Sequence, residues 1–202
     1  MDNIYIIGMG YIGFPLACLL AKKKKINCID IDKEKIEKFK NKILPFKEKN
    51  LKNLFIKYYS KFNFDTKILN VKKNNTYIIC VPTPLIRHKA DLKFLYNVFD
   101  SLNNLLKKND LIIIESTIPP KTTEKIYKKY KLYNKNVYLA YCPERAIPGN
   151  TLKEMKNNHR IIGGINTISS LKAKKIYSLV SKNIILTNSI EAEISKLAEN
   201  TY

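Results

Sequence analysis

The chain has 202 residues and a formal net charge of +20, from 37 Lys and Arg against 17 Asp and Glu. Its hydrophobic fraction of 45% is enough to bury a core, which argues against an intrinsically disordered chain. Almost all of the positive charge is Lys, with Arg only at 87, 145 and 160, whereas proteins that read base sequence rely on Arg. We therefore expect a solvated lysine-rich surface and no nucleic acid partner.

Short apolar segments alternate with Lys-rich helical segments along the chain, which is typical of a parallel sheet covered by helices. Segment 45–75 is predicted to mix a helix with loops, and a last helix is predicted from Ser189 onward. This order predicts an α/β fold of the Rossmann type, with a doubly wound, mostly parallel sheet and helices on both faces. Strands are predicted at 3–7, 26–31, 76–81, 111–115, 137–141, 160–163 and 183–186, and helices at 11–24, 33–40, 92–107, 121–130 and 168–180.

The cysteines and the long uncharged segment near the start indicate in which cellular compartment the protein is found. None of the cysteines forms a C-x-x-C pair, so buried free thiols in a reducing cytoplasm are favoured over disulfides or a metal site. Segment 4–21 carries no charge, but glycines and a proline divide it into two short apolar parts. We expect a cytoplasmic protein with no bound metal and no membrane partner. The cysteines are Cys18, Cys28, Cys80 and Cys142.

Residues 8–13 read G-M-G-Y-I-G, a G-x-G-x-x-G sequence that directly follows the predicted strand 3–7 and begins a helix. The next predicted strand reaches Asp30, about as far from the glycines as a dinucleotide site requires. The alternative is a glycine-rich turn with surface acids Asp30 and Asp32. The register of strand, helix and acid favours a dinucleotide site.

Each residue of this signature has a physical role. Gly8 permits a tight turn, Gly10 lets backbone N–H groups approach a pyrophosphate, and Gly13 lets helix and strand pack closely. The helix N-terminus adds partial positive charge beside the phosphates. Asp30 would accept hydrogen bonds from the adenosine ribose and disfavour a 2′-phosphate. The pattern therefore predicts NAD in preference to NADP.

Polar clusters follow three further predicted strands: V-P-T-P at 81–84, E-S-T-I-P at 115–119 and C-P-E-R at 142–145. Alone, each has a plain interpretation as a loop bounded by proline. Together they lie at the carboxyl ends of parallel strands, where open α/β sheets bind ligands. They predict one shared cleft.

With these motifs, the chain resembles the nucleotide-sugar 6-dehydrogenases, a family that includes UDP-glucose and UDP-N-acetylmannosamine dehydrogenases. The Y-C-P-E-R-A-I-P-G run and the R-I-I-G-G that follows look most like the N-acetylmannosamine branch, and the UDP-glucose branch is the alternative. A relative of the β-hydroxyacid and 3-hydroxyacyl-CoA dehydrogenases is weighed as well, and the three polar clusters argue against it. The resemblance rests on residues 8–13, 30, 81–84, 116–119, 142–149 and 192–202.

The resemblance implies oxidation of a sugar C6 alcohol to a carboxylate with two NAD, through a thioester on a cysteine. Lys196 would stabilise the alkoxide at C6 with Asn200 as its partner, and Thr117 and Glu144 would orient the hydrolytic water. Glu144 has an alternative role as a structural carboxylate paired with Arg145. The implied NAD contacts are Gly8, Gly10, Tyr11, Ile12, Gly13, Asp30, Thr83 and Thr117, and the implied UDP-sugar contacts are Arg145, Ala146, Lys196 and Asn200.

One part of the family pattern is missing. The family's nucleophile lies in a later G-G-x-C segment, and none of the cysteines here has that context. We expect an NAD-binding domain at 1–188 and, at 189–202, the start of a central helix that would join a homodimer of the full-length protein, with the UDP-binding domain absent. Such a chain would bind NAD without completing the oxidation alone. A standalone NAD-binding or regulatory module is the alternative.

Overall fold

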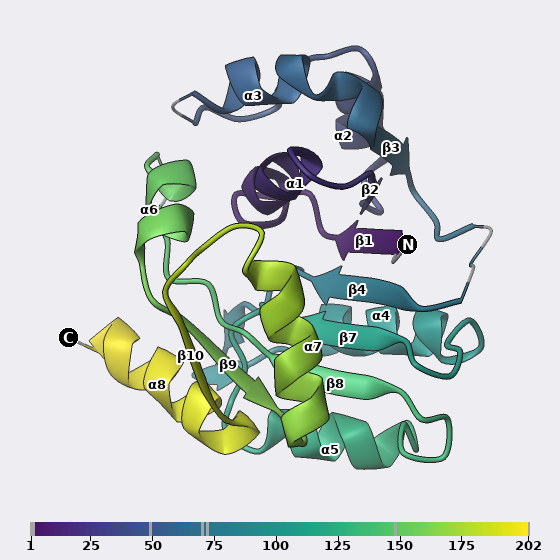
Figure 1. Ribbon diagram of the computed structural model, residues 1–202, viewed down its shortest axis with the longest axis vertical. Helices are drawn as coiled ribbons and strands as arrows, with labels where there is room; N and C mark the ends of the chain where they lie inside the picture. Colours follow the sequence, from purple (N-terminus) through teal and green to yellow (C-terminus); the bar gives the residue numbers. More distant parts are fainter. Residues whose placement is uncertain (1–2, 49, 70, 72, 148, 202) are drawn as a thin grey trace.

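The computed structural model describes residues 3–48, 50–69, 71, 73–147 and 149–201, without the side chains of residues 200 and 201. An eight-stranded sheet with the order β10-β9-β8-β7-β4-β1-β2-β3 forms its centre (Figure 1). The strands are β1 (Asn3–Ile7), β2 (Ile26–Ile29), β3 (Phe62–Asp65), β4 (Asn75–Ile79), β7 (Leu111–Ile114), β8 (Tyr138–Tyr141), β9 (Arg160–Gly164) and β10 (Ile184–Asn188).

The strand order reverses at the centre of the sheet. Strand β1 lies between β2 and β4 and runs parallel to both, so that Ile4 is paired with Ile26 on one side and Thr76 on the other. The chain then adds β3 beyond β2, and β7 and β8 beyond β4, all in parallel. This is the doubly wound order, in which ligands bind at the carboxyl ends of the strands beside the reversal. The predicted Rossmann-type α/β fold is confirmed.

Strand β9 reverses direction. It pairs antiparallel with β8, with Tyr141 opposite Gly163, and β10 runs parallel to β9. Because β9 is antiparallel, its first residue, Arg160, lies near the edge where the parallel strands end.

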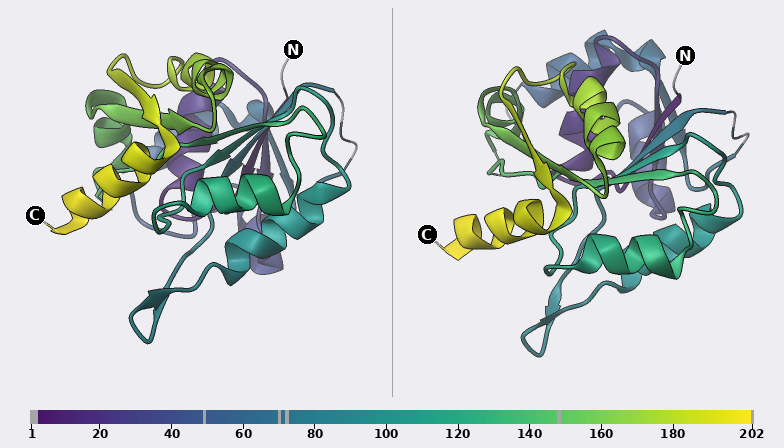
Figure 2. Two further views of the ribbon diagram at one scale, coloured as in Figure 1. Left: turned by 90° about the horizontal axis from the view of Figure 1, so that it is seen from below. Right: turned by 60° about the horizontal axis from the view of Figure 1, so that its bottom comes forward.

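Helices cover both faces of the sheet, with α1, α6 and α7 on one face and α4 and α5 on the other (Figures 1 and 2). Successive residues of β1 divide between two cores: Ile4 and Ile6 pack with α1, and Tyr5 and Ile7 pack with α4 and α5. This explains why the strands are apolar throughout. The helices are α1 (Gly13–Ala21), α2 (Lys33–Lys40), α3 (Leu51–Lys57), α4 (Lys93–Asn103), α5 (Thr122–Lys129), α6 (Thr151–Asn157), α7 (Thr167–Tyr177) and α8 (Ser189–Thr201), with a 3₁₀ turn η1 at Tyr59–Lys61.

The uncharged segment 4–21 folds as β1, the glycine turn and α1. Among the residues that the structure describes, no helix is long and apolar enough to cross a membrane.

Strand β3, helix α6 and a two-stranded hairpin were not predicted. Strand β3 extends the sheet beyond β2, and α6 packs against α1. The hairpin of β5 (Leu85–Ile86) and β6 (Lys89–Ala90) projects from the body of the protein (Figure 2).

Candidate cofactor site and catalytic cluster

The glycine loop between β1 and α1 has the geometry that a bound pyrophosphate requires. Gly8 has φ +98°, and a Cβ there would lie 2.5 Å from the carbonyl oxygen of Cys80. A Cβ on Gly13 would collide with the carbonyl oxygen of Gly8, whereas a Cβ on Gly10 would meet nothing within 4 Å. Gly8 and Gly13 therefore serve packing, and Gly10 keeps space open beside the N-terminus of α1, which no side chain caps.

Asp30 lies directly after β2 and is 8% exposed. Its Oδ2 accepts hydrogen bonds from the Met9 N–H and from Lys35 Nζ, both at 2.8 Å, and its Oδ1 accepts from the Asp32 N–H at 3.0 Å. The carboxylate is thus fixed beside the glycine loop. Lys35 was not predicted as a site residue, because one Lys among so many carries no signal in the sequence.

A pocket of about 670 Å³ opens at the carboxyl ends of β1, β2 and β4, where the strand order reverses. Gly8, Gly10 and Asp30 line it, so the structure brings these predicted residues together. Val81 of the V-P-T-P cluster belongs to the apolar part of the wall. The rest of that part was not predicted because it belongs to no motif; it comes from Ile31, Ile68, Phe94, Val98 and Leu105. An apolar wall beside a buried carboxylate and an uncapped helix N-terminus suits an adenine, a ribose and a pyrophosphate in turn.

Tyr11 and Ile12 lie beside this pocket in the glycine turn. The Tyr11 side chain is half exposed and its ring lies 4.8 Å from that of Phe46. Ile12 is partly buried against the core on the α1 face. Their predicted contacts with NAD stay predictions.

The loops after β4 and β7 are joined. Thr83 Oγ1 donates a hydrogen bond of 2.7 Å to the carbonyl oxygen of Thr117, and Ser116 Oγ donates one of 2.6 Å to the carbonyl oxygen of Val81. Thr83 and Thr117 are therefore neighbours at the carboxyl edge of the sheet, next to the pocket wall formed by Val81 and Pro82. Their predicted contacts with NAD stay predictions.

Glu144 is buried in the loop after β8. Its Oε1 accepts hydrogen bonds from the backbone N–H groups of Arg145 (2.7 Å) and Ala146 (2.8 Å), and its Oε2 forms an ion pair with Arg160. The alternative pairing with the Arg145 side chain is wrong, because that guanidinium binds Glu199 of α8.

Lys196 lies on α8 close to this cluster. The pKa of Lys196 is lowered from its ordinary value, mainly because the side chain is partly buried. Glu144 opposes this decrease, and Arg145 adds to it. The structure thus brings Lys196, Glu144 and Arg145 to one corner. The side chain of Asn200 lies outside the described part of the chain.

The cysteines are free and unsuited to nucleophilic attack, which needs the thiolate. Burial raises the pKa of the Cys142 thiol to about 12, although Arg160 opposes the rise. Burial also raises the pKa of Cys18, Cys28 and Cys80. The described residues contain no cluster of side chains that could hold a metal ion.

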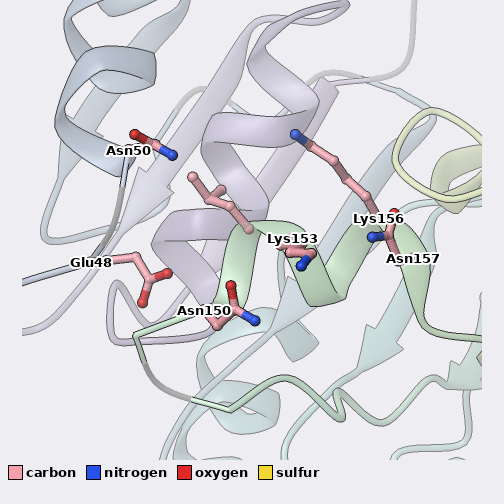
Figure 3. A pocket seen from close by; sticks show the side chains of 7 residues that line it. Glu48, Asn50, Asn150, Lys153, Lys156 and Asn157 are labelled. Carbon is pink, nitrogen blue, oxygen red and sulfur yellow. The ribbon is translucent and has the colours of Figure 1, made fainter.

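A second pocket, of about 470 Å³, lies between α6 and the segment before α3 (Figure 3). Its wall consists mainly of Lys and Asn side chains and shares no residue with the first pocket. Glu48, at its rim, accepts hydrogen bonds from the backbone N–H groups of Gly149 and Thr151, both at 2.8 Å. Glu48 therefore caps α6, a structural role that the sequence did not reveal.

Comparison with known proteins agrees with this geometry. Residues 2–181 match the NAD binding domain of the UDP-glucose/GDP-mannose dehydrogenase family. The UDP-N-acetyl-D-mannosamine dehydrogenase of Methanococcus aeolicus is 45% identical over an alignment of 209 positions, which covers 100% of this chain and 48% of that protein.

Solved structures agree as well. The UDP-D-ManNAc dehydrogenase of Pyrococcus horikoshii superposes with a TM-score of 0.93 at 35% identity over 98% of this chain and 50% of that one. A UDP-N-acetyl-mannosamine dehydrogenase from Staphylococcus aureus gives 0.91 at 32% identity, over 100% and 51% of the two chains. This chain thus spans about half the length of these relatives. It belongs to the UDP-glucose/GDP-mannose dehydrogenase family and carries that family's NAD-binding domain.

Proposed function

We propose that the chain is the cofactor-binding part of a UDP-N-acetyl-D-mannosamine dehydrogenase, which oxidises the C6 alcohol of the sugar to a carboxylate with two NAD. One observation carries the proposal: the NAD-type pocket and the Glu144–Lys196 corner lie along the same carboxyl edge of the sheet. The names of the relatives support the N-acetylmannosamine branch. UDP-glucose as substrate is the alternative within the family.

NAD, when bound, accepts the hydride from C6. The backbone N–H groups at Gly10 and the start of α1 would hold its pyrophosphate, and Asp30 its adenosine ribose. Gly8 and Gly13 would shape the loop, Tyr11 and Ile12 would contact the same part of the cofactor, and Thr83 and Thr117 would flank its nicotinamide half.

The corner formed by Glu144 and Lys196 would act on the sugar. Lys196 would stabilise negative charge on the C6 oxygen, because a partly desolvated ammonium interacts strongly with a developing alkoxide. Asn200 would assist it, and Arg145 and Ala146 would contact the substrate. Glu144 and Thr117 would orient the water that releases the product.

The domain arrangement of the whole protein is part of the same proposal. Residues 1–188 would form the cofactor domain, and α8, which leaves the body of the protein (Figure 1), would begin the helix that joins two copies in a homodimer. A cysteine in another part of the whole protein would be the nucleophile. We place the protein in the cytoplasm, a proposal supported by its free thiols.

Calorimetric titration and absorbance at 340 nm test the proposal. The 202-residue chain should bind NAD more tightly than NADP and should form no NADH with UDP-N-acetylmannosamine. The whole protein should form NADH with UDP-N-acetylmannosamine faster than with UDP-glucose. Formation of the sugar carboxylate by the 202-residue chain would refute the assignment of the nucleophile, and NAD binding without turnover by the whole protein would favour a regulatory module.

A further inference from the structure

We propose that Arg160 is a positioning residue for Glu144, that it holds the Glu144 carboxylate in a fixed orientation near Lys196, and that Glu115 anchors the Arg160 guanidinium in this task. The inference rests on the proposed function for the part that Glu144 plays. It starts from a buried ionic cluster that no motif of the sequence predicted.

Arg160 lies between two carboxylates. Its NH1 group donates to Glu115 Oε1 at 2.7 Å, and its NH2 group binds Glu144 Oε2. The side chains of Arg160, Glu115 and Glu144 are 3%, 0% and 5% exposed. A guanidinium can bind two carboxylates at once because its nitrogens point in fixed, different directions, and an ammonium lacks that geometry.

Glu115 holds the other side of Arg160 in place. Besides Arg160, its Oε1 accepts a hydrogen bond of 2.7 Å from Tyr177 Oη, and its Oε2 accepts one of 3.2 Å from Cys80 Sγ. The Arg160 guanidinium also lies 4.5 Å from the centre of the Tyr177 ring. The guanidinium therefore has little freedom to move away from Glu144.

Every contact of Glu144 is of the kind that a carboxylate makes. Two backbone N–H groups donate to Oε1, and Arg160 donates to Oε2. A protonated carboxyl is itself a donor and needs an acceptor, whereas these three partners are donors. In the described structure the three donors therefore fix the plane of the Glu144 carboxylate.

The direction of β9 makes this arrangement possible. A side chain at the start of a parallel strand would lie at the opposite edge of the sheet, whereas antiparallel β9 begins near the carboxyl edge. Arg160 thus reaches under the loops that follow β7 and β8. Two carboxylates and one guanidinium are a costly group to bury, and such groups are found preferentially at functional sites.

Other charged or titratable groups also lie near Glu144. Lys196 approaches from α8 and Arg145 from its own loop, and Cys142 lies close by. Glu154 and His159 line the small crevice beside it. Arg160 is the cation that contacts its carboxylate in the described structure, so its removal should have the largest effect.

The experiment follows the carboxyl carbons of Glu144 and Glu115 by NMR from pH 4 to 9, in the 202-residue chain labelled with ¹³C in Glu. Arg160→Met should raise the titration midpoint of Glu115, because Arg160 lowers the pKa of that buried carboxyl. The same variant should shift and broaden the Glu144 carboxyl resonance, because that carboxylate is no longer held in one orientation. Arg160→Lys, which has one ammonium for two partners, should change at least one of these two signals. Glu115→Gln should also shift the Glu144 resonance, since the guanidinium loses the carboxylate that anchors it.

The Glu144 resonance distinguishes positioning from simple packing, because it reports the surroundings of that carboxylate. Arg145→Met is the matched control and should shift the Glu144 resonance less than Arg160→Met does. The proposal is overturned if Arg160→Met and Glu115→Gln lower the melting temperature and leave the Glu144 resonance unmoved. If Arg160→Met does not fold, Glu115→Gln and Arg160→Lys decide. Binding of NAD is measured in parallel: failure of the unmodified chain to bind NAD would refute the cofactor function, whereas intact binding with an unmoved Glu144 resonance would refute only the role of Arg160.

Discussion

Replacing Glu193 with Ala should destabilise the protein strongly, although Glu193 contacts no part of the cofactor pocket. Glu193 is 0% exposed and joins α8 to the beginning of α5. Its Oε1 accepts hydrogen bonds from the backbone N–H (2.8 Å) and Oγ1 (2.6 Å) of Thr123, and its Oε2 accepts from the Lys121 N–H at 2.5 Å. Lys121 has φ +67°, a left-handed conformation that these hydrogen bonds help to hold.

The expected loss follows from the donors left behind. Thr123 is fully buried, so both of its donors would lose their partner without access to water. An unsatisfied buried donor costs about 1–3 kcal/mol, so the free energy of unfolding should fall by about 2–6 kcal/mol. For a domain of this size, this corresponds to a decrease in melting temperature of about 5–20 °C.

Thermal and urea unfolding followed by circular dichroism measure the change. Glu191→Ala is the control, because Glu191 is exposed on the same helix and its hydrogen bond to the Asn188 N–H is 3.5 Å long. That variant should lose no more than about 0.5 kcal/mol. Equal losses in the two variants would show that helix propensity, and not the buried carboxylate, accounts for the effect.

Three further predictions concern the cofactor site and the thiols. Asp30→Asn should weaken NAD binding by about 10- to 100-fold, through the loss of charge-assisted hydrogen bonds to the ribose, and should reduce the preference for NAD over NADP. Calorimetry with both cofactors measures this, and an unchanged affinity for NAD would contradict the role given to Asp30. Gly13→Ala should lower the free energy of unfolding by about 1–3 kcal/mol, because the added Cβ meets the Gly8 carbonyl oxygen. Gly10→Ala should keep the stability of the protein and bind NAD less well. Equal unfolding temperatures for the two variants would contradict the roles given to these glycines. The raised pKa of the buried thiols should make the free energy of unfolding fall as the pH rises above about 8.5, because the unfolded chain releases thiol protons that the folded chain retains. Cys28→Ala should make this fall with pH less steep in urea unfolding measured at several pH values. An unchanged pH dependence would show that the Cys28 thiol does not contribute to it.

The sequence was most informative where pattern and geometry are local. Strand β1 was predicted with its observed bounds, Asn3–Ile7, because a buried parallel strand is apolar throughout and the glycine turn ends it sharply. The bounds of α2 were also correct, since Asp32 caps its first turn by accepting a hydrogen bond from the Lys35 N–H.

The missed features depend on distant partners. Helix α6 has seven residues, and the carboxylate that caps it, Glu48, is 103 positions before Thr151. The direction of β9 cannot be read from its residues, because an apolar strand suits parallel and antiparallel pairing alike. Without that direction, Arg160 could not be placed beside Glu144.

The strand order also bears on how the protein can fold while it is being synthesised. Strand β1 is the first of these strands to be made and lies inside the sheet, with strands on both sides. Every later strand of this sheet pairs with a strand that is already present: β2 and β4 with β1, β3 with β2, β7 with β4, and β8, β9 and β10 each with the one before. No strand of the large sheet has to wait for a partner nearer the C-terminus. The sheet can therefore grow outward in the order of translation, which limits the time that an apolar strand edge is exposed to other chains.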